Sequence, residues 1–107
     1  MNKKSFCYLP FGHVLLKTKG TVGVCCHYKP QLKDQTFKTN IDGIEGWWNS
    51  EELHQLRQQF LAGEKPAGCS FCYEMEDRGF ESIRTRTLEE FKLYRPSLDN
   101  PKIIAVS

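Results

Sequence analysis

Apolar and polar positions near the N-terminus predict a β-hairpin. Val14, Leu15 and Leu16 favour a strand over residues 13–17, and residues 22–26 are predicted to form the returning strand. Residues 18–21 supply turn chemistry, with Gly20 free to adopt a positive φ. Residues 8–11 are predicted to be extended. Residues 27–40 contain Pro30 and no periodicity, so we expect a loop that ends in a turn over residues 40–43.

The apolar spacing changes to a helical period over residues 49–62. Asn49 is the predicted N-cap with Glu52 three positions later, and Gly63 suits the left-handed residue after the last turn. We expect Glu51, Arg57 and Gln58 to face solvent. The expected buried face consists of Leu53, Leu56, Phe60 and Leu61.

The C-terminal third predicts a turn over residues 72–77 that ends at Gly79, and a second amphipathic helix over residues 82–94. Its expected buried positions are Ile83, Leu88, Phe91 and Tyr94. Residues 102–106 form an apolar run that predicts a fully buried strand. The chain has 107 residues, which suits one small α+β domain: a hairpin followed by two to three short helices.

Charge and hydropathy exclude several classes of protein. The 15 basic and 13 acidic residues are spread along the chain, so a nucleic-acid interface is not favoured. Pro10 and Gly12 interrupt the apolar stretch that follows Lys3 and Lys4, which argues against a signal peptide, and no run is long enough to span a membrane. We therefore expect a cytoplasmic protein, in which five cysteines are metal ligands rather than disulfides.

The C-x2-C pair Cys69 and Cys72 is the strongest chemical signal, because a turn of this kind directs two sulfurs toward one metal centre. The remaining ligands must come from other cysteines or from histidines. Adjacent residues in a strand point to opposite faces, so only one member of a neighbouring cysteine pair is expected to bind. The candidates are Cys7, Cys25, Cys26, His13, His27 and His54.

Spacing alone leaves the kind of site open. An iron–sulfur cluster and a structural zinc site, with four cysteines or with three cysteines and His27, both fit the donors. A zinc module that binds nucleic acid is disfavoured by the charge pattern. A chance set of free thiols is disfavoured by the knuckle and its distant partner cysteines.

The pattern Cys7-x12-Gly20-x4-Cys25, followed by Cys69-x2-Cys72, resembles the SPASM/Twitch auxiliary iron–sulfur domain that accompanies radical S-adenosylmethionine (radical SAM) enzymes. The segment 48–53, WNSEEL, and the run 63–66 before the knuckle also look like this family, and the resemblance covers about residues 7–86. It implies that Cys7, Cys25, Cys69 and Cys72 hold one [4Fe–4S] cluster for electron transfer or substrate positioning. Cys26 and His27 are then less favoured ligands, Gly20 is the turn, and Zn²⁺ is the alternative cofactor.

The motif Cys72-x3-Glu76-x2-Gly79-x2-Ser82-x-Arg84 is similar to Twitch-type proteins in which this domain precedes the catalytic barrel. The resemblance implies a cluster-binding domain over residues 1–96, and a linker with the start of a barrel strand over residues 97–107, belonging to a truncated radical SAM core. The C-x3-C-x2-C motif for S-adenosylmethionine chemistry does not occur, so we do not expect an enzyme in this chain alone.

The resemblance further implies that a radical SAM core in the same or a separate chain is the partner, with a peptide or small molecule as substrate. Cysteines beyond Cys72, which full SPASM domains use for a second cluster, are absent from the sequence. From the residues themselves, we expect Arg84 to pair on the surface with Glu81 or Glu89, and Glu76 to lie in a solvated turn.

Overall fold

A small mixed sheet forms the centre of the molecule. The computed structural model describes residues 5–16, 22–24, 41–91 and 96–106. Strand β1 (His13–Leu16) pairs antiparallel with β2 (Val22–Gly23) and parallel with β3 (Ala105–Val106), which gives the order β2-β1-β3. The predicted strand pair is thus present. Its turn, including Gly20, and the end of the predicted second strand lie outside the described residues.

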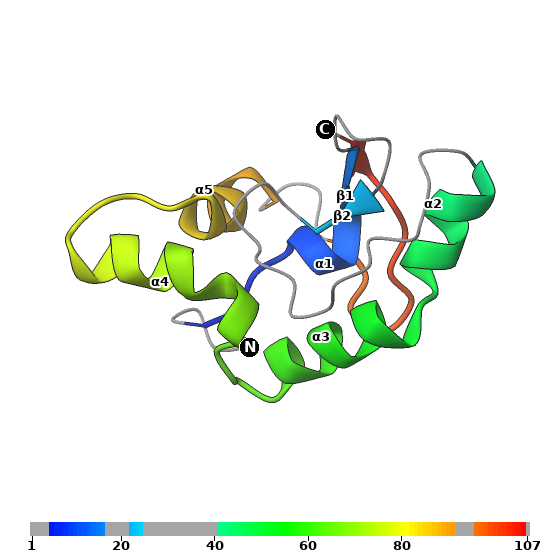
Figure 1. The fold of residues 1–107 in the computed structure, drawn as a ribbon. Helices are drawn as coiled ribbons and strands as arrows, with labels where there is room; N and C mark the ends of the chain where they lie inside the picture. The colour runs from blue at the N-terminus through cyan, green and yellow to red at the C-terminus, as the bar shows by residue number, and fades with distance from the viewer. Residues whose placement is uncertain (1–4, 17–21, 25–40, 92–95, 107) are drawn as a thin grey trace.

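Helices surround this sheet, so the predicted α+β class is confirmed. They are α1 (Leu9–Gly12), α2 (Ile41–Trp48), α3 (Glu51–Leu61), the short 3-10 helix η1 (Ala67–Cys69), α4 (Ser70–Asp77) and α5 (Ile83–Glu90). α4 and α5 lie together at one end of the molecule, α2 lies at the other, and α3 runs beneath α1 between them (Figure 1). This arrangement separates the knuckle end from the sheet end.

The two ends of α3 differ in how well the sequence predicts them. The C-terminal end is as predicted, because Gly63 has a φ of 79° and its N–H donates to the carbonyl oxygen of Phe60 at 3.1 Å. The predicted N-cap Asn49 is wrong by one residue: the side chain of Ser50 accepts the hydrogen bond from the N–H of Leu53 at 3.2 Å.

The predicted buried face of α3 is correct for Leu53, Leu56 and Phe60 but wrong for two other residues. Leu61 is 43% exposed, whereas Arg57 is only 7% exposed. The guanidinium of Arg57 lies over the ring of Trp48 and donates hydrogen bonds to the carbonyl oxygens of Pro10 and Trp48 at 2.7 and 3.0 Å. A long side chain can therefore be buried on this face because it reaches carbonyl acceptors.

Two helices replace segments that were predicted to be irregular. Residues 9–12 form α1 rather than an extended segment, because Pro10 stands in the first turn, where its missing N–H costs nothing. α2 includes residues 41–43, which were predicted to form a turn. α4 is a longer helix than the predicted turn, and α5 begins as predicted with Ser82 as its N-cap; residue 94 at the predicted end lies outside the described residues.

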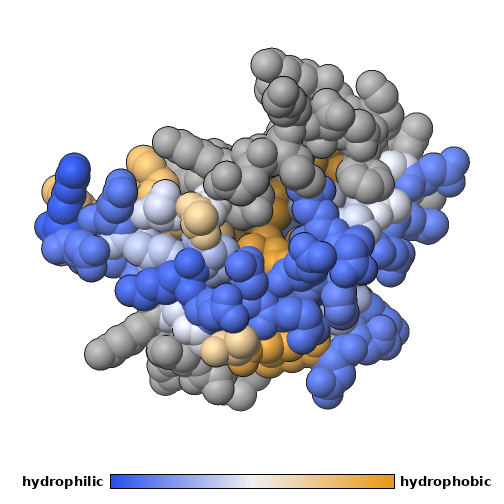
Figure 2. All heavy atoms as spheres, turned by 60° about the horizontal axis from the view of Figure 1, so that its bottom comes forward, coloured by the Kyte–Doolittle hydropathy of each residue, from blue (hydrophilic) through white to orange (hydrophobic). Residues whose placement is uncertain are grey.

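The core is rich in aromatic side chains. The ring of Phe6 is fully buried, and its centroid lies 5.0 Å from that of Tyr8, 5.3 Å from Phe11 and 6.1 Å from Phe60. Hydrophilic side chains cover the outer side of α3, with apolar atoms gathered behind them (Figure 2). The fully buried or nearly buried apolar set comprises Phe6, Cys7, Tyr8, Leu9, Phe11, Val14, Val22, Val24, Trp47, Trp48, Leu53, Leu56, Phe60 and Phe91.

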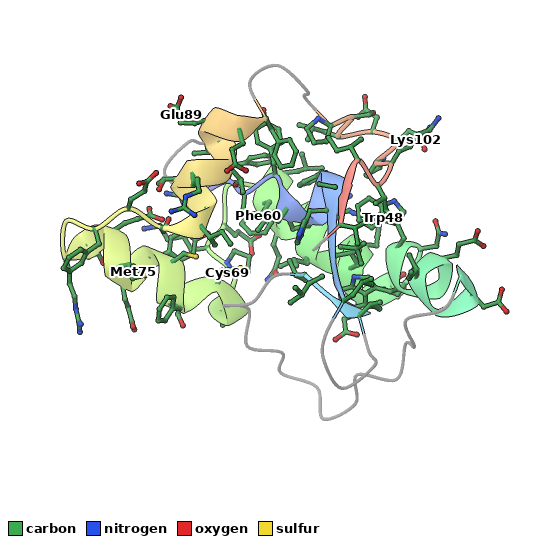
Figure 3. The ribbon with its side chains drawn as sticks, turned by 90° about the horizontal axis from the view of Figure 1, so that it is seen from above. Trp48, Phe60, Cys69, Met75, Glu89 and Lys102 are labelled. Atoms are coloured by element: carbon green, nitrogen blue, oxygen red, sulfur yellow. The ribbon has the colours of Figure 1, made fainter. Side chains whose placement is uncertain are left out.

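The C-terminal segment lies on this core but is not a fully buried strand. The indole N–H of Trp48 donates to the carbonyl oxygen of Pro101 at 2.9 Å, on the side of the molecule away from Cys69 (Figure 3). Only Ala105–Val106 is strand, and Ile104 and Val106 are 50% and 57% exposed, so the prediction of full burial is wrong. That this segment begins a barrel stays a prediction. Within the described ranges, no helix is long and apolar enough to cross a membrane.

Candidate metal centre

The knuckle is formed by a 3-10 turn that passes directly into a helix. The N–H of Cys69 donates to the carbonyl oxygen of Pro66 at 3.0 Å, and Cys69 then serves as the N-cap of α4. Cys72 stands three positions later in the first turn of that helix, where residues with this spacing share one face. Cys69 is partly exposed and Cys72 is buried, and both thiols are free of disulfide bonds. The local fold therefore presents the two side chains together, as the C-x2-C spacing predicts.

The sulfur of Cys72 lies at the N-terminus of α5. The backbone N–H groups of Ile83 and Arg84 both hydrogen-bond to this thiol. Burial raises the pKa of Cys72 above its ordinary value, and the carboxylate of Glu76 adds to that rise, while the two N–H donors and the charge of Arg84 oppose it. The free thiol is consequently protonated at neutral pH, so a metal that binds it must displace a proton.

Cys7 reaches the same helix from the other end of the sequence. Its Sγ lies 4.0 Å from the hydroxyl oxygen of Thr87, one turn further along α5, and that hydroxyl donates to the carbonyl oxygen of Arg84 at 2.8 Å. Cys7 is 7% exposed. α5 therefore contacts both Cys72, at its first turn, and Cys7, one turn later.

Tyr73 lies among the sulfurs. Its hydroxyl donates to the carbonyl oxygen of Ser5 at 2.6 Å. Burial raises the pKa of Tyr73 well above its ordinary value, the negative charges of Cys69 and Cys7 raise it further, and the charge of Arg84 opposes them. Cys69 and Cys7 therefore act on the same phenol.

A buried ion pair completes this neighbourhood. Arg84, 3% exposed, donates from Nε to Glu76 Oε2 at 2.9 Å and forms a second contact from Nη2 to Oε1. The hydroxyl of Ser82 donates to the same Glu76 oxygen at 2.5 Å. Burial alone would raise the pKa of Glu76, but the hydrogen bonds from Arg84 and Ser82, with the charges of Arg84 and Lys65, hold it below its ordinary value. The expected surface pairing of Arg84 with Glu81 or Glu89 is wrong, as is a solvated Glu76.

Three of the four predicted ligands thus share neighbours. Cys7 and Cys72 both interact electrostatically with Arg84, and Cys7 and Cys69 both interact with Tyr73. Among the residues that the structure describes, no three cysteine, histidine or acidic side chains are arranged closely enough to hold a metal ion. The remaining predicted ligand, Cys25, and its alternatives Cys26 and His27 lie outside the described residues.

The other two histidines lie apart from the knuckle. His13, in β1, is 8% exposed, and its Nδ1 is 3.1 Å from the carbonyl oxygen of Val24. His54 is exposed on α3. As free side chains, the sulfurs fit a metal centre chemically: they are soft donors, and one already receives backbone N–H bonds of the kind that surround cluster sulfurs.

Four residues that support the sulfurs were not predicted as site residues: Tyr73, Glu76, Arg84 and Thr87. The signal for two of them was the acid and the base on either side of Gly79, a glycine with a φ of 86°. A left-handed residue ends α4 and redirects the chain into α5, so an acid before it can meet a base after it. Tyr73 and Thr87 carry no comparable signal in the sequence.

Comparisons with family models, with curated proteins and with solved structures find no match to this chain.

Proposed function

We propose that this chain is an iron–sulfur module that accompanies a radical SAM core, with one [4Fe–4S] cluster held by Cys7, Cys25, Cys69 and Cys72. The observation that carries the proposal is the convergence of Cys7 with the distant knuckle on α5. Cys7 lies against Thr87, and Cys72 receives the first N–H groups of that helix. Folding has therefore already brought together sulfurs that are far apart in the sequence.

The surroundings of the sulfurs also support a cluster rather than incidental thiols. Reduced clusters carry negative charge, and backbone N–H donors together with a buried cation stabilise such charge. The first turn of α5 supplies two N–H donors to Cys72, and Arg84 supplies the cation. When bound, the cluster would supply one-electron transfer or a docking point for substrate. The chain's own residues would fix the sulfurs and exclude water from Cys7 and Cys72.

The first test is the metal content of protein purified without oxygen. We expect about four iron and four sulfide per chain for a [4Fe–4S] site. Stoichiometric zinc without sulfide would instead support a structural zinc site with four cysteines, or with three cysteines and His27. Material without bound metal after anaerobic reconstitution with either metal would refute both.

The second test assigns the ligands by substitution. Cys69→Ser and Cys25→Ser should each abolish cluster retention and lower the stability of the fold, because metal binding contributes to folding. Cys26→Ser is the matched control, since it removes the neighbouring sulfur and should leave iron and sulfide content unchanged. Retention by Cys25→Ser together with loss by Cys26→Ser would exchange their roles.

A further inference from the structure

We infer that the Glu76–Arg84 ion pair sets the electron affinity of the sulfur site, with its two members acting in opposite directions. This inference rests on the proposed function. Arg84 places a buried positive charge beside Cys7 and Cys72, whereas Glu76 places a negative charge beside Cys72. The pair therefore acts on the site as two separate charges rather than as one neutral unit.

Arg84 is fixed at this position by contacts on three sides. Its Nη1 donates to the carbonyl oxygen of Phe6 at 2.9 Å, one residue before Cys7. Its Nε and Nη2 bind the Glu76 carboxylate, and its backbone N–H bonds to the thiol of Cys72. One residue thereby ties together the two distant sulfur-bearing segments, and its charge cannot move away from them without breaking these contacts.

Glu76 is located unequally with respect to the two sulfurs. It stands four positions after Cys72 on the same helix, so the two side chains share one face of α4. Its charge acts on Cys72, while Arg84 acts on both Cys72 and Cys7. Glu76 therefore counteracts Arg84 mainly at the knuckle and leaves the effect of Arg84 on Cys7.

The consequence concerns a one-electron reduction at the site. An external one-electron donor loses the electron, and the sulfur-bound group gains it together with one negative charge. Nearby positive charge favours that product and nearby negative charge opposes it, and burial strengthens both effects. Arg84→Gln should therefore lower the reduction potential, and Glu76→Gln should raise it.

The experiment compares five reconstituted proteins by redox titration with an EPR or optical readout, with iron and sulfide measured on each: wild type, Arg84→Gln, Glu76→Gln, the double variant, and Arg86→Gln. Arg86 is exposed on the same helix and is the matched control. We expect each single change to shift the redox equilibrium about tenfold, or about 59 mV for a one-electron couple, in opposite directions. The double variant should lie between the two single variants, and Arg86→Gln should match the wild type.

Shifts in the same direction, or shifts no larger than that of Arg86→Gln, would overturn the inference, because a merely structural pair predicts no opposition of sign. If Arg84→Gln fails to retain iron, Arg84→Lys and Glu76→Gln decide the matter. The lysine variant keeps the charge and should stay near the wild-type potential, while Glu76→Gln should still lie above it. A lowered lysine variant or an unshifted Glu76→Gln would count against the pair.

The outcome for the wild type separates this inference from the proposed function. If the wild type takes up only zinc, the iron–sulfur proposal fails. The ion pair is then tested by zinc affinity against a chelator, since four thiolates around Zn²⁺ also carry net negative charge. Arg84→Gln should weaken that affinity about tenfold and Glu76→Gln should strengthen it. Equal affinities would reject the inference, and a wild type that binds neither metal would reject both proposals.

Discussion

Gly12 controls how closely the C-terminal segment packs onto the sheet. An ideal Cβ at this position would lie 2.8 Å from Pro96 Cγ and 3.1 Å from Ile104 Cγ1. The proline ring has no alternative rotamer that could move it away, so its backbone must shift. The carbonyl oxygen of Gly12 also accepts the N–H of Ile104 at 2.8 Å, next to the point where β1 and β3 begin to pair. Gly12→Ala should therefore loosen residues 96–106.

The expected cost follows from two opposing effects. Overpacking a tight contact costs about 1–3 kcal/mol, and replacing a helical glycine with alanine recovers about 0.5–1 kcal/mol. The φ of Gly12 is not in the left-handed region, so no backbone strain is added. The net loss should be about 1 kcal/mol of unfolding free energy, which lowers Tm by about 4 °C for a domain of this size.

The assay is urea unfolding followed by tryptophan fluorescence, combined with hydrogen exchange at the Ile104 amide. Trp48 reports on the segment because its indole N–H binds the Pro101 carbonyl oxygen. Gly79→Ala is the control, since a Cβ there meets nothing within 4 Å and its cost comes from a φ of +86°. It should lower global stability without a local loss of protection at Ile104. Unchanged stability and unchanged Ile104 exchange in Gly12→Ala would refute the packing argument.

Three further changes test the local energetics. Ser82→Ala should cost about 2–3 kcal/mol, because it removes an N-cap and a hydrogen bond to the Glu76 carboxylate, whereas Ser50→Ala removes only a cap and should cost about 1 kcal/mol; equal losses in chemical denaturation would contradict this. Burial lowers the pKa of His13, and its hydrogen bond to a backbone carbonyl only partly opposes this, so the unfolded chain binds more protons below pH 6.5. Stability should therefore be unaffected by His13 above that pH and decrease below it, and His13→Gln should reduce the loss between pH 7.5 and 5.5; an identical loss would exclude this origin. Phe6→Ala should cost about 3–5 kcal/mol in the same assay, and a loss under 1 kcal/mol would show that the aromatic cluster can repack.

Local signals in the sequence predicted only part of this fold. Gly63 was placed correctly because a helix C-terminus depends on its own few residues. The burial of Arg57 could not be predicted in that way, because its acceptors belong to residues elsewhere in the chain, including Pro10 in α1. The run over residues 102–106 shows the same limit. Its apolar residues fit a buried strand, but the sheet offers a partner on one side only, through β1, and Val106 remains 57% exposed.

The candidate site divides along the same line. The knuckle was predictable, since its two cysteines lie in one local turn. The position of Cys7 against Thr87 joins residues 80 positions apart, and no periodicity encodes such a contact. Tyr73 was also missed, because its hydroxyl finds its acceptor in Ser5, near the start of the chain. Whether Cys25 or Cys26 supplies the fourth sulfur stays a prediction from the resemblance.

The motif that follows the knuckle can now be understood as one mechanical unit. Cys72 and Glu76 share a face of α4, and Gly79, in the left-handed region, ends that helix and redirects the chain. Ser82 then caps α5 and also donates to Glu76, so the same hydroxyl that starts the second helix fixes the acid of the first. Arg84 returns to that acid with its side chain and to Cys72 with its backbone N–H. Every position in the motif thus holds either a sulfur or the charge beside it. A change at Gly79 should consequently affect metal retention through helix orientation, although no atom of Gly79 need approach the metal.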